Sequence, residues 1–464
     1  MPRQSSKDPR INHALRHSIK DGVAYSVMAG AGETYFSAFA LFYKATTTQI
    51  GLLASLPPLV SSLAQLFSAW LSHTAITRRQ VILTGASLQA MIWLPMMLLP
   101  VLFPTQAVPL IILCIVLYHA TGNAVVPHWS SLMGDLVPER RRGRYFARRT
   151  RNTSISAFIA LILAGLVLDS FRQHDLAVYG FITVFGIAAL ARCVSIYHLT
   201  WLVETQKEQV IIGPTLEGGW WQRAKQSRFF HFSVYFASMQ TAVAIGSPFF
   251  AVYMLRDLQF TYVQFMVLSA STVLMQFLTL NAWGRISDRF GNRLILFATG
   301  FAIPVIPALW LVSHDFFYLV GVQLTSGLLW AGFSLSAGNF LYDLIAPPRR
   351  ATYLALHNVL TNIGIFSGAM LGGYLGAHVP KMFTLFGVSH TLHSPLLWVF
   401  LISCMARLSV ALIFLPRLKE VRNVIPMTVT KLIFRATRFS ALSGLIYDVI
   451  GASRKRSPVK TEPK

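Results

Sequence analysis

Long apolar segments alternate with short polar ones along the whole chain, and this pattern predicts membrane-spanning helices. About twelve segments carry almost no charge over close to the ~20 residues that a helix needs to cross a bilayer. These segments are apolar throughout instead of alternating, which favours helices over a β-barrel, because each helix satisfies its own backbone hydrogen bonds. We expect the spans at roughly 20–43, 49–73, 80–103, 107–134, 150–169, 177–203, 229–255, 262–284, 292–313, 316–342, 351–379 and 394–416.

Charge distribution sets the expected topology. The chain has 464 residues, 54% of them hydrophobic and 12% charged, whereas a soluble domain carries about 25% charged residues. Of its 40 Lys and Arg residues, the loops opposite the N-terminus carry only Lys44, Arg172, Arg256 and Lys381. The positive-inside rule therefore predicts that both termini are cytoplasmic, and localisation in a bacterial inner membrane is expected. The formal net charge of +23 then reflects topology and contact with anionic lipid headgroups, not nucleic-acid binding.

The sequence offers little support for enzyme chemistry. It contains neither a glycine-rich phosphate loop nor a His/Cys cluster with metal-ligand spacing, so no cofactor or metal is expected. No Ser/His or His/Asp constellation gathers at one membrane face, so an enzyme is not expected. Cys114, Cys193 and Cys404 fall inside apolar spans, which predicts buried, reduced thiols without disulfides. The first twenty residues are polar and basic, so no cleavable signal peptide is expected.

Two motifs occur twice, about 210 residues apart, which indicates an internal duplication. WGRISDRFGNRLIL runs from Trp283 to Leu296, and a copy that matches it only in part, WLSHTAITRRQVIL, begins at Trp70. DLVPERRRGRYF begins at Asp135, and DLIAPPRRATYL begins at Asp343. Two related halves are typical of secondary transporters built from repeated helical bundles.

The predicted organisation is all-α, with two six-helix bundles between polar segments. We expect a cytoplasmic segment at 1–19, an N-terminal bundle at 20–204, a connector at 205–228, a C-terminal bundle at 229–416 and a basic tail at 417–464. Apolar residues recur at helical spacing in this tail, which predicts an amphipathic helix on the inner leaflet. The alternative is a partly disordered, solvated tail.

The motif set resembles that of the major facilitator superfamily over about residues 20–416. That family carries Gly-x-x-x-Asp-Arg-x-Gly-x-Arg/Lys between helices two and three and again between helices eight and nine. The second copy is matched by Gly284, Asp288, Arg289, Gly291 and Arg293. The resemblance implies the family's twelve-helix fold and a cytoplasmic gate at this cluster, which closes in the outward-open state. A basic loop that only fixes topology is the alternative, but it would need neither the Asp nor the two glycines.

The first copy departs from the family pattern, because Ala75 occupies the acidic position. The other repeated motif resembles the family's Asp-Pro-Arg turn, with Asp135 and Arg142 in one half and Asp343 and Arg350 in the other. We expect these residues to join the gate, although a role in topology and lipid-headgroup binding is the simpler alternative. Helix five lacks the Gly-Pro motif of the family's drug/proton antiporters, which disfavours that subclass.

Glu33 is the strongest candidate for the transport site, because it is the only acidic residue near the middle of a predicted span. Such a carboxylate suits proton coupling or the binding of a cationic substrate, and a structural hydrogen-bond network is the alternative. The resemblance places helices one, four, seven and ten around the central cavity. Further candidates for proton coupling or substrate binding near mid-span are His119, Asn123, Gln240, Gln323 and Trp330.

Arg192 and Arg407 occupy matching positions in helices six and twelve. We expect a structural ion pair at each, with Asp135 or Asp343 as candidate partners. The sequence as a whole predicts a monomeric secondary transporter that moves a small polar or amphipathic molecule by alternating access, with protons as the coupling ion. An uncoupled facilitator and a transport-inactive membrane scaffold or sensor are the alternatives. The sequence does not specify the substrate.

Overall fold

The computed structural model is almost entirely helical. It describes residues 9–71, 77–137, 139–204, 227–345, 350–380, 382–385, 388–391 and 394–420. Eleven described segments are long and apolar enough to cross a membrane. The expectation of a helical membrane protein of about twelve spans is therefore confirmed. The predicted tail helix and most of the predicted connector lie outside the described residues.

The first half of the chain forms one group of helices. The first span is interrupted where one continuous helix was expected, and it consists of α1 (Pro9–Ala31), the 3-10 turn η1 (Glu33–Tyr35) and α2 (Phe36–Phe42). The others are α3 (Thr47–Leu71), α4 (Arg78–Leu102), η2 (Pro104–Gln106), α5 (Ala107–Leu136), α6 (Glu139–Gln173) and α7 (Ala177–Leu199). In this half α1 packs on α6 and α7, while α5 packs on α3 and α4.

The second half forms a similar group. Its elements are α9 (Arg228–Gly246), α10 (Phe249–Val252), the π-helical turn η3 (Tyr253–Asp257), α11 (Tyr262–Phe290), α12 (Asn292–Ala302), α13 (Val305–Leu309), α14 (Phe316–Leu344), α15 (Arg350–His378), α16 (Leu396–Phe414) and η5 (Leu415–Arg417). Here α9 packs on α15 and α16, and α14 packs on α11 and α12.

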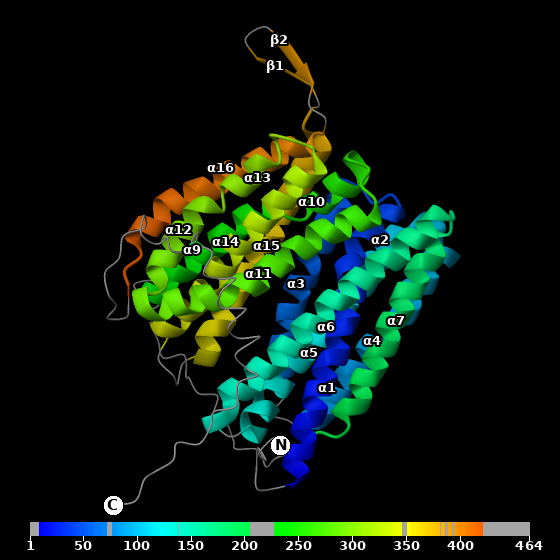
Figure 1. Ribbon diagram of the computed structural model, residues 1–464, viewed down its shortest axis with the longest axis vertical. Coiled ribbons are helices and arrows are strands. Elements are labelled where there is room, and N and C mark those ends of the chain that lie inside the picture. Colours follow the sequence, from blue (N-terminus) through cyan, green and yellow to red (C-terminus); the bar gives the residue numbers. More distant parts are fainter. Residues whose placement is uncertain are drawn as a thin grey trace, which may run out of the picture.

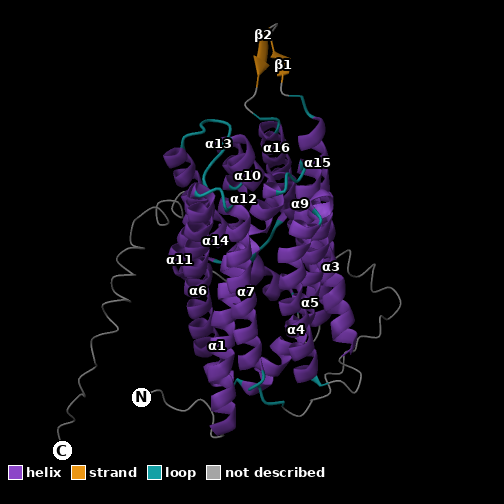
Figure 2. Ribbon diagram, turned by 90° about the vertical axis from the view of Figure 1, so that its right-hand side faces the viewer, coloured by secondary structure: helices purple, strands orange, loops and turns teal. Residues whose placement is uncertain are grey.

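A short antiparallel hairpin, β1 (Met382–Leu385) and β2 (Val388–Thr391), is the one described departure from helix. It projects beyond the ends of α15 and α16, as Figure 2 shows. We call this end of the molecule, where α3 begins and α15 ends, the hairpin end. The opposite end, where α1 and α4 begin and α5 ends, is called the basic end.

The two halves touch at the hairpin end, where α3 packs on α15, α6 packs on α11 and α2 packs on α10. Arg256 Nη1 donates to Thr47 Oγ1 at 3.2 Å across this boundary. In the reverse direction, Arg172 Nη1 donates to the Phe260 carbonyl at 3.3 Å. Figure 1 shows the helices of the two halves diverging from there toward the basic end.

Candidate functional site

A cavity of about 430 Å³, called the central cavity below, lies in the N-terminal half beside α15 of the other half. Residues of α2, α3 and α5 line it, together with Glu33 of η1 and Asn362 of α15. Its polar lining includes Glu33, Ser37, Gln65, His119, Asn123 and Asn362. The cavity therefore brings together the predicted candidates Glu33, His119 and Asn123, which the sequence had placed on two different helices.

The break in the first span presents Glu33 to this cavity. The two glycines just before Glu33 are required by close packing. A Cβ at Gly30 would lie 2.2 Å from the Ala157 carbonyl oxygen. A Cβ at Gly32 would lie 2.2 Å from the Trp93 ring. Glycine also weakens a helix, so the chain leaves the α-helix at Gly32 and turns through η1. Glu33 is thus the first residue of the turn and points into the cavity.

Tyr118 holds one oxygen of the Glu33 carboxylate. Its buried hydroxyl donates to Glu33 Oε1 at 2.7 Å. The described residues provide no hydrogen-bond donor to the other oxygen, Oε2. The carboxylate is therefore held on one side, and its second oxygen can accept a hydrogen bond from a ligand.

A second polar cluster borders the cavity between α3 and α5. The Asn123 amide donates to the His119 carbonyl at 2.8 Å and to Ser61 Oγ at 3.3 Å, and it accepts from Gln65 Nε2 at 3.1 Å. The His119 ring packs edge-on against Phe36 and Tyr118. This network fixes the amides, while the His119 imidazole remains on the cavity wall.

Gln240 and Trp330 line a different cavity, of about 160 Å³, inside the C-terminal half. Its other walls include Phe236, Phe333 and His357. Gln323 lies on α14, where its backbone carbonyl accepts from Thr272 Oγ1 at 3.3 Å. The structure therefore separates these three candidates from Glu33.

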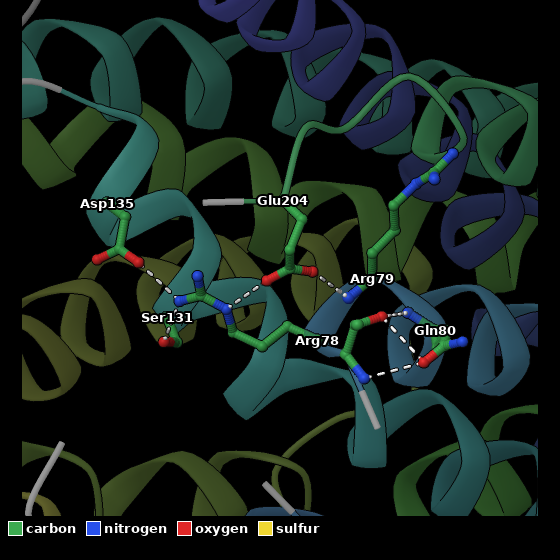
Figure 3. A network of polar contacts seen from close by, with 7 residues as sticks. Arg78, Arg79, Gln80, Ser131, Asp135 and Glu204 are labelled. Carbon is green, nitrogen blue, oxygen red and sulfur yellow. Dashed lines mark hydrogen bonds and ion pairs between the residues drawn. The ribbon is translucent and has the colours of Figure 1, made fainter. Parts of the chain in front are cut away.

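At the basic end, Arg78 is the centre of a charged network that joins three elements (Figure 3). Its guanidinium lies 2.7 Å from Asp135 Oδ2 of α5 and 3.0 Å from Glu204 Oε1, which follows α7. Arg78 also donates to Ser131 Oγ at 3.0 Å. Glu204 Oε2 accepts from the backbone N–H of Arg79 at 2.9 Å. Ala75, in the first copy of the gate motif, lies outside the described residues.

The C-terminal half repeats this arrangement with less charge. The Arg293 backbone N–H donates to Glu420 Oε2 at 2.8 Å, as that of Arg79 does to Glu204. The contact that Arg78 makes to Asp135 is made in this half by Asn292, whose amide donates to Asp343 Oδ2 at 3.1 Å. The predicted duplication is thus visible in side-chain contacts, with an amide where the first half has a guanidinium.

The gate motif of the second half forms the turn from α11 to α12. Gly291 has φ 85°, a conformation that favours glycine. Asp288 and Arg289 are exposed, and the described part of the chain offers Asp288 no hydrogen bond or ion pair. Around Gly284 there is space, because an added Cβ would meet only Leu335, at 4.0 Å. The side chains of Arg142 and Arg350 lie outside the described residues.

The paired arginines have different surroundings from those expected. Arg192 donates to Ser195 Oγ at 2.9 Å, and Ser195 donates to Asp21 Oδ1 at 2.7 Å. The carboxylate near Arg192 is therefore Asp21, not Asp135. Arg407 is 2% exposed and donates to Ser403 Oγ at 3.1 Å and to the Val243 carbonyl at 3.3 Å. Among the described residues, no carboxylate pairs with Arg407.

Sequence reasoning missed several residues in or beside the central cavity. Tyr118, Gln65 and the helix prolines Pro57 and Pro58 were not candidates. The tyrosine had no distinguishing sequence signal, but two adjacent prolines inside an apolar span were a visible one. No group of three or more metal-ligating side chains is placed to hold a metal among the described residues.

Comparison with known proteins identifies the architecture. The model of the MFS_1 like family matches residues 25–388. The class C tetracycline resistance protein of Escherichia coli is 31% identical over 117 residues, which are 25% of this chain and 29% of that protein. The major facilitator-type transporter psiT2 of Psilocybe cubensis is 30% identical over 103 residues, 22% of this chain and 20% of that protein. The matches thus span less than a third of either relative.

Solved structures share the fold over most of the chain. The nucleoside transporter NupG superposes with a TM-score of 0.62 at 14% identity, covering 88% of this chain and 100% of that one. A bacterial homologue of the iron transporter ferroportin, in an inward-facing state, gives 0.65 at 12% identity, covering 87% and 98%. The D-xylose-proton symporter gives 0.65 at 12% identity, covering 89% and 99%. At these identities the likeness establishes the fold alone.

Proposed function

We propose that this chain, which belongs to the MFS_1 like family of major facilitator transporters, is a proton-coupled secondary transporter whose substrate binds beside Glu33. The observation that carries the proposal is the central cavity, because Glu33 is the one acidic residue among its described lining. Hydroxyl, amide and imidazole groups surround it. Such a lining suits a small polar or amphipathic solute.

The contacts between the halves support alternating access. They gather at the hairpin end, where Arg256 contacts Thr47 and Arg172 contacts the Phe260 carbonyl. We assign the hairpin end to the outside and the basic end to the cytoplasm, because nearly all basic loop residues belong to the latter. The conformation described is then closed outside and inward-facing. Rocking of the halves would open the hairpin end.

Proton coupling follows from the two states of Glu33. In the cycle we propose, the ionised carboxylate carries a negative charge within the membrane, and either a proton or a positively charged group neutralises it. Protonation removes that charge and lowers the free-energy cost of enclosing the site while the two halves rock around it. The open Oε2 atom is where the proton would bind.

The gate at the basic end would close when Asp288 reaches the other half. Asp288 is exposed in the described conformation, as an open gate requires. We propose that in the outward-facing state it accepts hydrogen bonds from the first turn of a neighbouring helix, whose positive dipole end favours a carboxylate. Asp288→Asn should then raise the labelling of single cysteines placed at the basic end, while unchanged labelling would remove Asp288 from the gate.

A thermal-shift screen of the purified protein against metabolites, peptides, lipids and drugs tests the site first. A ligand raises the unfolding temperature according to its affinity and concentration. The strongest ligand is then followed into proteoliposomes under an imposed pH gradient. We expect gradient-driven uptake in the wild type, and loss of both the thermal shift and the uptake in Glu33→Gln.

Asp169→Asn is the matched control, because Asp169 bonds Gln173 on α6 and does not line the cavity. It should behave as the wild type. Full proton-driven uptake by Glu33→Gln would contradict the coupling role. A well-folded protein that binds nothing in the screen and transports nothing would instead favour a scaffold or sensor.

A further inference from the structure

Two adjacent prolines lie within α3, and they change the hydrogen bonding of its backbone. Pro57 and Pro58 fall inside the helix Thr47–Leu71. Proline has no backbone N–H, so the carbonyl four residues earlier loses its helical donor. The Ala54 carbonyl is affected twice, because the residues three and four positions later are both proline. The Leu53 carbonyl loses its α-helical donor as well.

The altered stretch faces the central cavity. Leu53, Ala54, Pro57, Pro58 and Ser61 all line it, and at helical spacing they form one face of α3. The gap between the Ala54 carbonyl and Pro58 therefore lies on the cavity wall.

Side chains satisfy neighbouring carbonyls of α3 but not this one. Hydroxyls of Ser55 and Ser62 donate to the carbonyls of Leu52 and Leu59, respectively. No described side chain donates to the Ala54 carbonyl. A backbone acceptor that lacks its donor in a membrane protein is expected to line a wet cavity or to meet a ligand.

The rest of the cavity also favours a donor. Glu33 Oε2 is open, and no Lys or Arg occurs among the described residues of the lining. The largely buried aromatic ring of Phe36 contributes apolar lining. The lining thus combines one negative charge, a carbonyl without its α-helical donor and an aromatic side chain.

We propose that this cavity takes an organic cation that carries N–H donors, namely a primary ammonium or a guanidinium group. One N–H donates to Glu33 Oε2 and another donates to the Ala54 carbonyl. A volume of about 430 Å³ is far larger than a bare metal ion needs, which leaves room for an attached organic skeleton. This proposal rests on the proposed transport function and specifies its substrate class.

The proposal also determines how a proton and the substrate share Glu33. A protonated carboxyl no longer attracts the ammonium group, so binding of one monovalent cation releases one proton. Each exchange therefore leaves the charge of the site unchanged.

A matched ligand series tests the substrate class. The purified full chain is titrated with 2-phenylethylamine, its N,N,N-trimethyl derivative, 2-phenylethanol and 3-phenylpropanoate, with the thermal shift as readout. We expect binding by the amine, at least tenfold weaker binding by the quaternary ion, which lacks N–H donors, and none by the carboxylate. Equal binding of the alcohol and the amine would overturn the proposal.

Pro58→Ala tests the carbonyl itself. The new N–H at position 58 satisfies the Ala54 carbonyl within the helix, so the amine should bind about tenfold more weakly. Pro95→Ala in α4 is the control, because Pro95 is also inside a helix but does not line the cavity. Unchanged amine affinity in Pro58→Ala would contradict the role of the carbonyl.

The two proposals fail in different ways. If protons drive uptake of a neutral or anionic ligand through a Glu33-dependent site, the substrate class is wrong and the transport function stands. If the amine binds but neither it nor any other ligand is transported, the transport function is wrong.

Discussion

Tyr118 is the described residue that fixes the Glu33 carboxylate, through a 2.7 Å hydrogen bond. Tyr118→Phe removes this donor and keeps the ring in its buried position. Hydrogen bonds to charged groups contribute about 1.5–3 kcal/mol, so transport should fall by at least about tenfold. Tyr318→Phe is the control, because that hydroxyl donates to the Leu309 carbonyl in the other half. Equal uptake by Tyr118→Phe and the wild type would show that the contact does not position Glu33.

His17 predicts a pH-dependent stability at the basic end. Its Nδ1 lies 3.1 Å from Nδ1 of His198, and burial, followed by the nearby His13, His198 and Lys20, lowers its pKa below the ordinary 6.5. The unfolded chain then binds the proton more tightly than the folded one. Stability is therefore complete above about pH 6.5 and is lost as the pH falls through the lowered pKa.

The measurement is the unfolding temperature between about pH 7.5 and about pH 5.5, a range that spans the ordinary titration of histidine. His17→Asn should flatten the decline, whereas His174→Asn, at an exposed histidine bonded to its own helix, should leave it unchanged. A decline of the same slope in all three proteins would assign it to other groups.

At the scale of the elements, we expect the seam between α3 and α15 to hold the hairpin end closed. A Cβ at Gly51 would lie 2.8 Å from the Ala369 carbonyl oxygen, in the opposite half of the molecule. Gly51→Ala should therefore separate the two helices and increase the population that is open at the hairpin end. Cysteine labelling at that end measures the change. Gly321→Ala adds the same methyl group where nothing lies within 4 Å, and it should label as the wild type. Unchanged labelling of Gly51→Ala would mean that this seam does not control closure.

The Arg78 network predicts a difference in stability between the two halves. The Arg78 side chain is 6% exposed, so Arg78→Gln leaves Asp135 and Glu204 without their shared cation. Because the two carboxylates are 39% and 30% exposed, water screens part of the loss, and we expect a destabilisation of about 1–3 kcal/mol.

Arg293→Gln is the matched control in the other half, because the described contact to Glu420 uses its backbone N–H. It should lower the unfolding temperature much less than Arg78→Gln. Equal losses in the two variants would show that Arg78 is no more important than an ordinary surface arginine.

Some elements were predictable from the sequence and others were not. Hydropathy predicted the spans, and the repeated motifs predicted a duplication that the contacts of Arg79 and Arg293 display. The break at Gly32 was not predicted, because an apolar stretch shows where a span lies and not whether its helix is continuous. Gly30 and Gly32 were a signal, but their need to approach Ala157 and Trp93 is a tertiary property.

The candidate site was predictable only in part, for a similar reason. Glu33, His119 and Asn123 share a cavity, whereas Gln240 and Trp330 line another. Depth in a span can be read from sequence, but the face on which a side chain lies depends on packing. The partners of Arg192 illustrate this, because Asp21 comes from the first helix and not from a loop.

At the scale of the whole molecule, the two halves are alike in topology and different in chemistry. The large polar cavity and the charged network around Arg78 belong to the N-terminal half. The second half carries the exposed gate motif, and the uncharged Asn292 side chain contacts Asp343 there. We infer that the first half binds substrate while the second half supplies most of the movable gate.

The most direct test of alternating access is the distance between the halves at both ends, measured by double electron-electron resonance. One label pair replaces Tyr179 and Phe317 near the hairpin end, and the other replaces Tyr197 and Tyr342 near the basic end, all four being exposed. The native Cys114, Cys193 and Cys404 are replaced first, because only Cys114 is buried as expected, whereas Cys404 is partly exposed and Cys193 is exposed. Lowering the pH should lengthen the first distance and shorten the second in the wild type, and Glu33→Gln should not respond. Distances that stay fixed at both ends, or that change in the same direction, would contradict the proposed transport cycle.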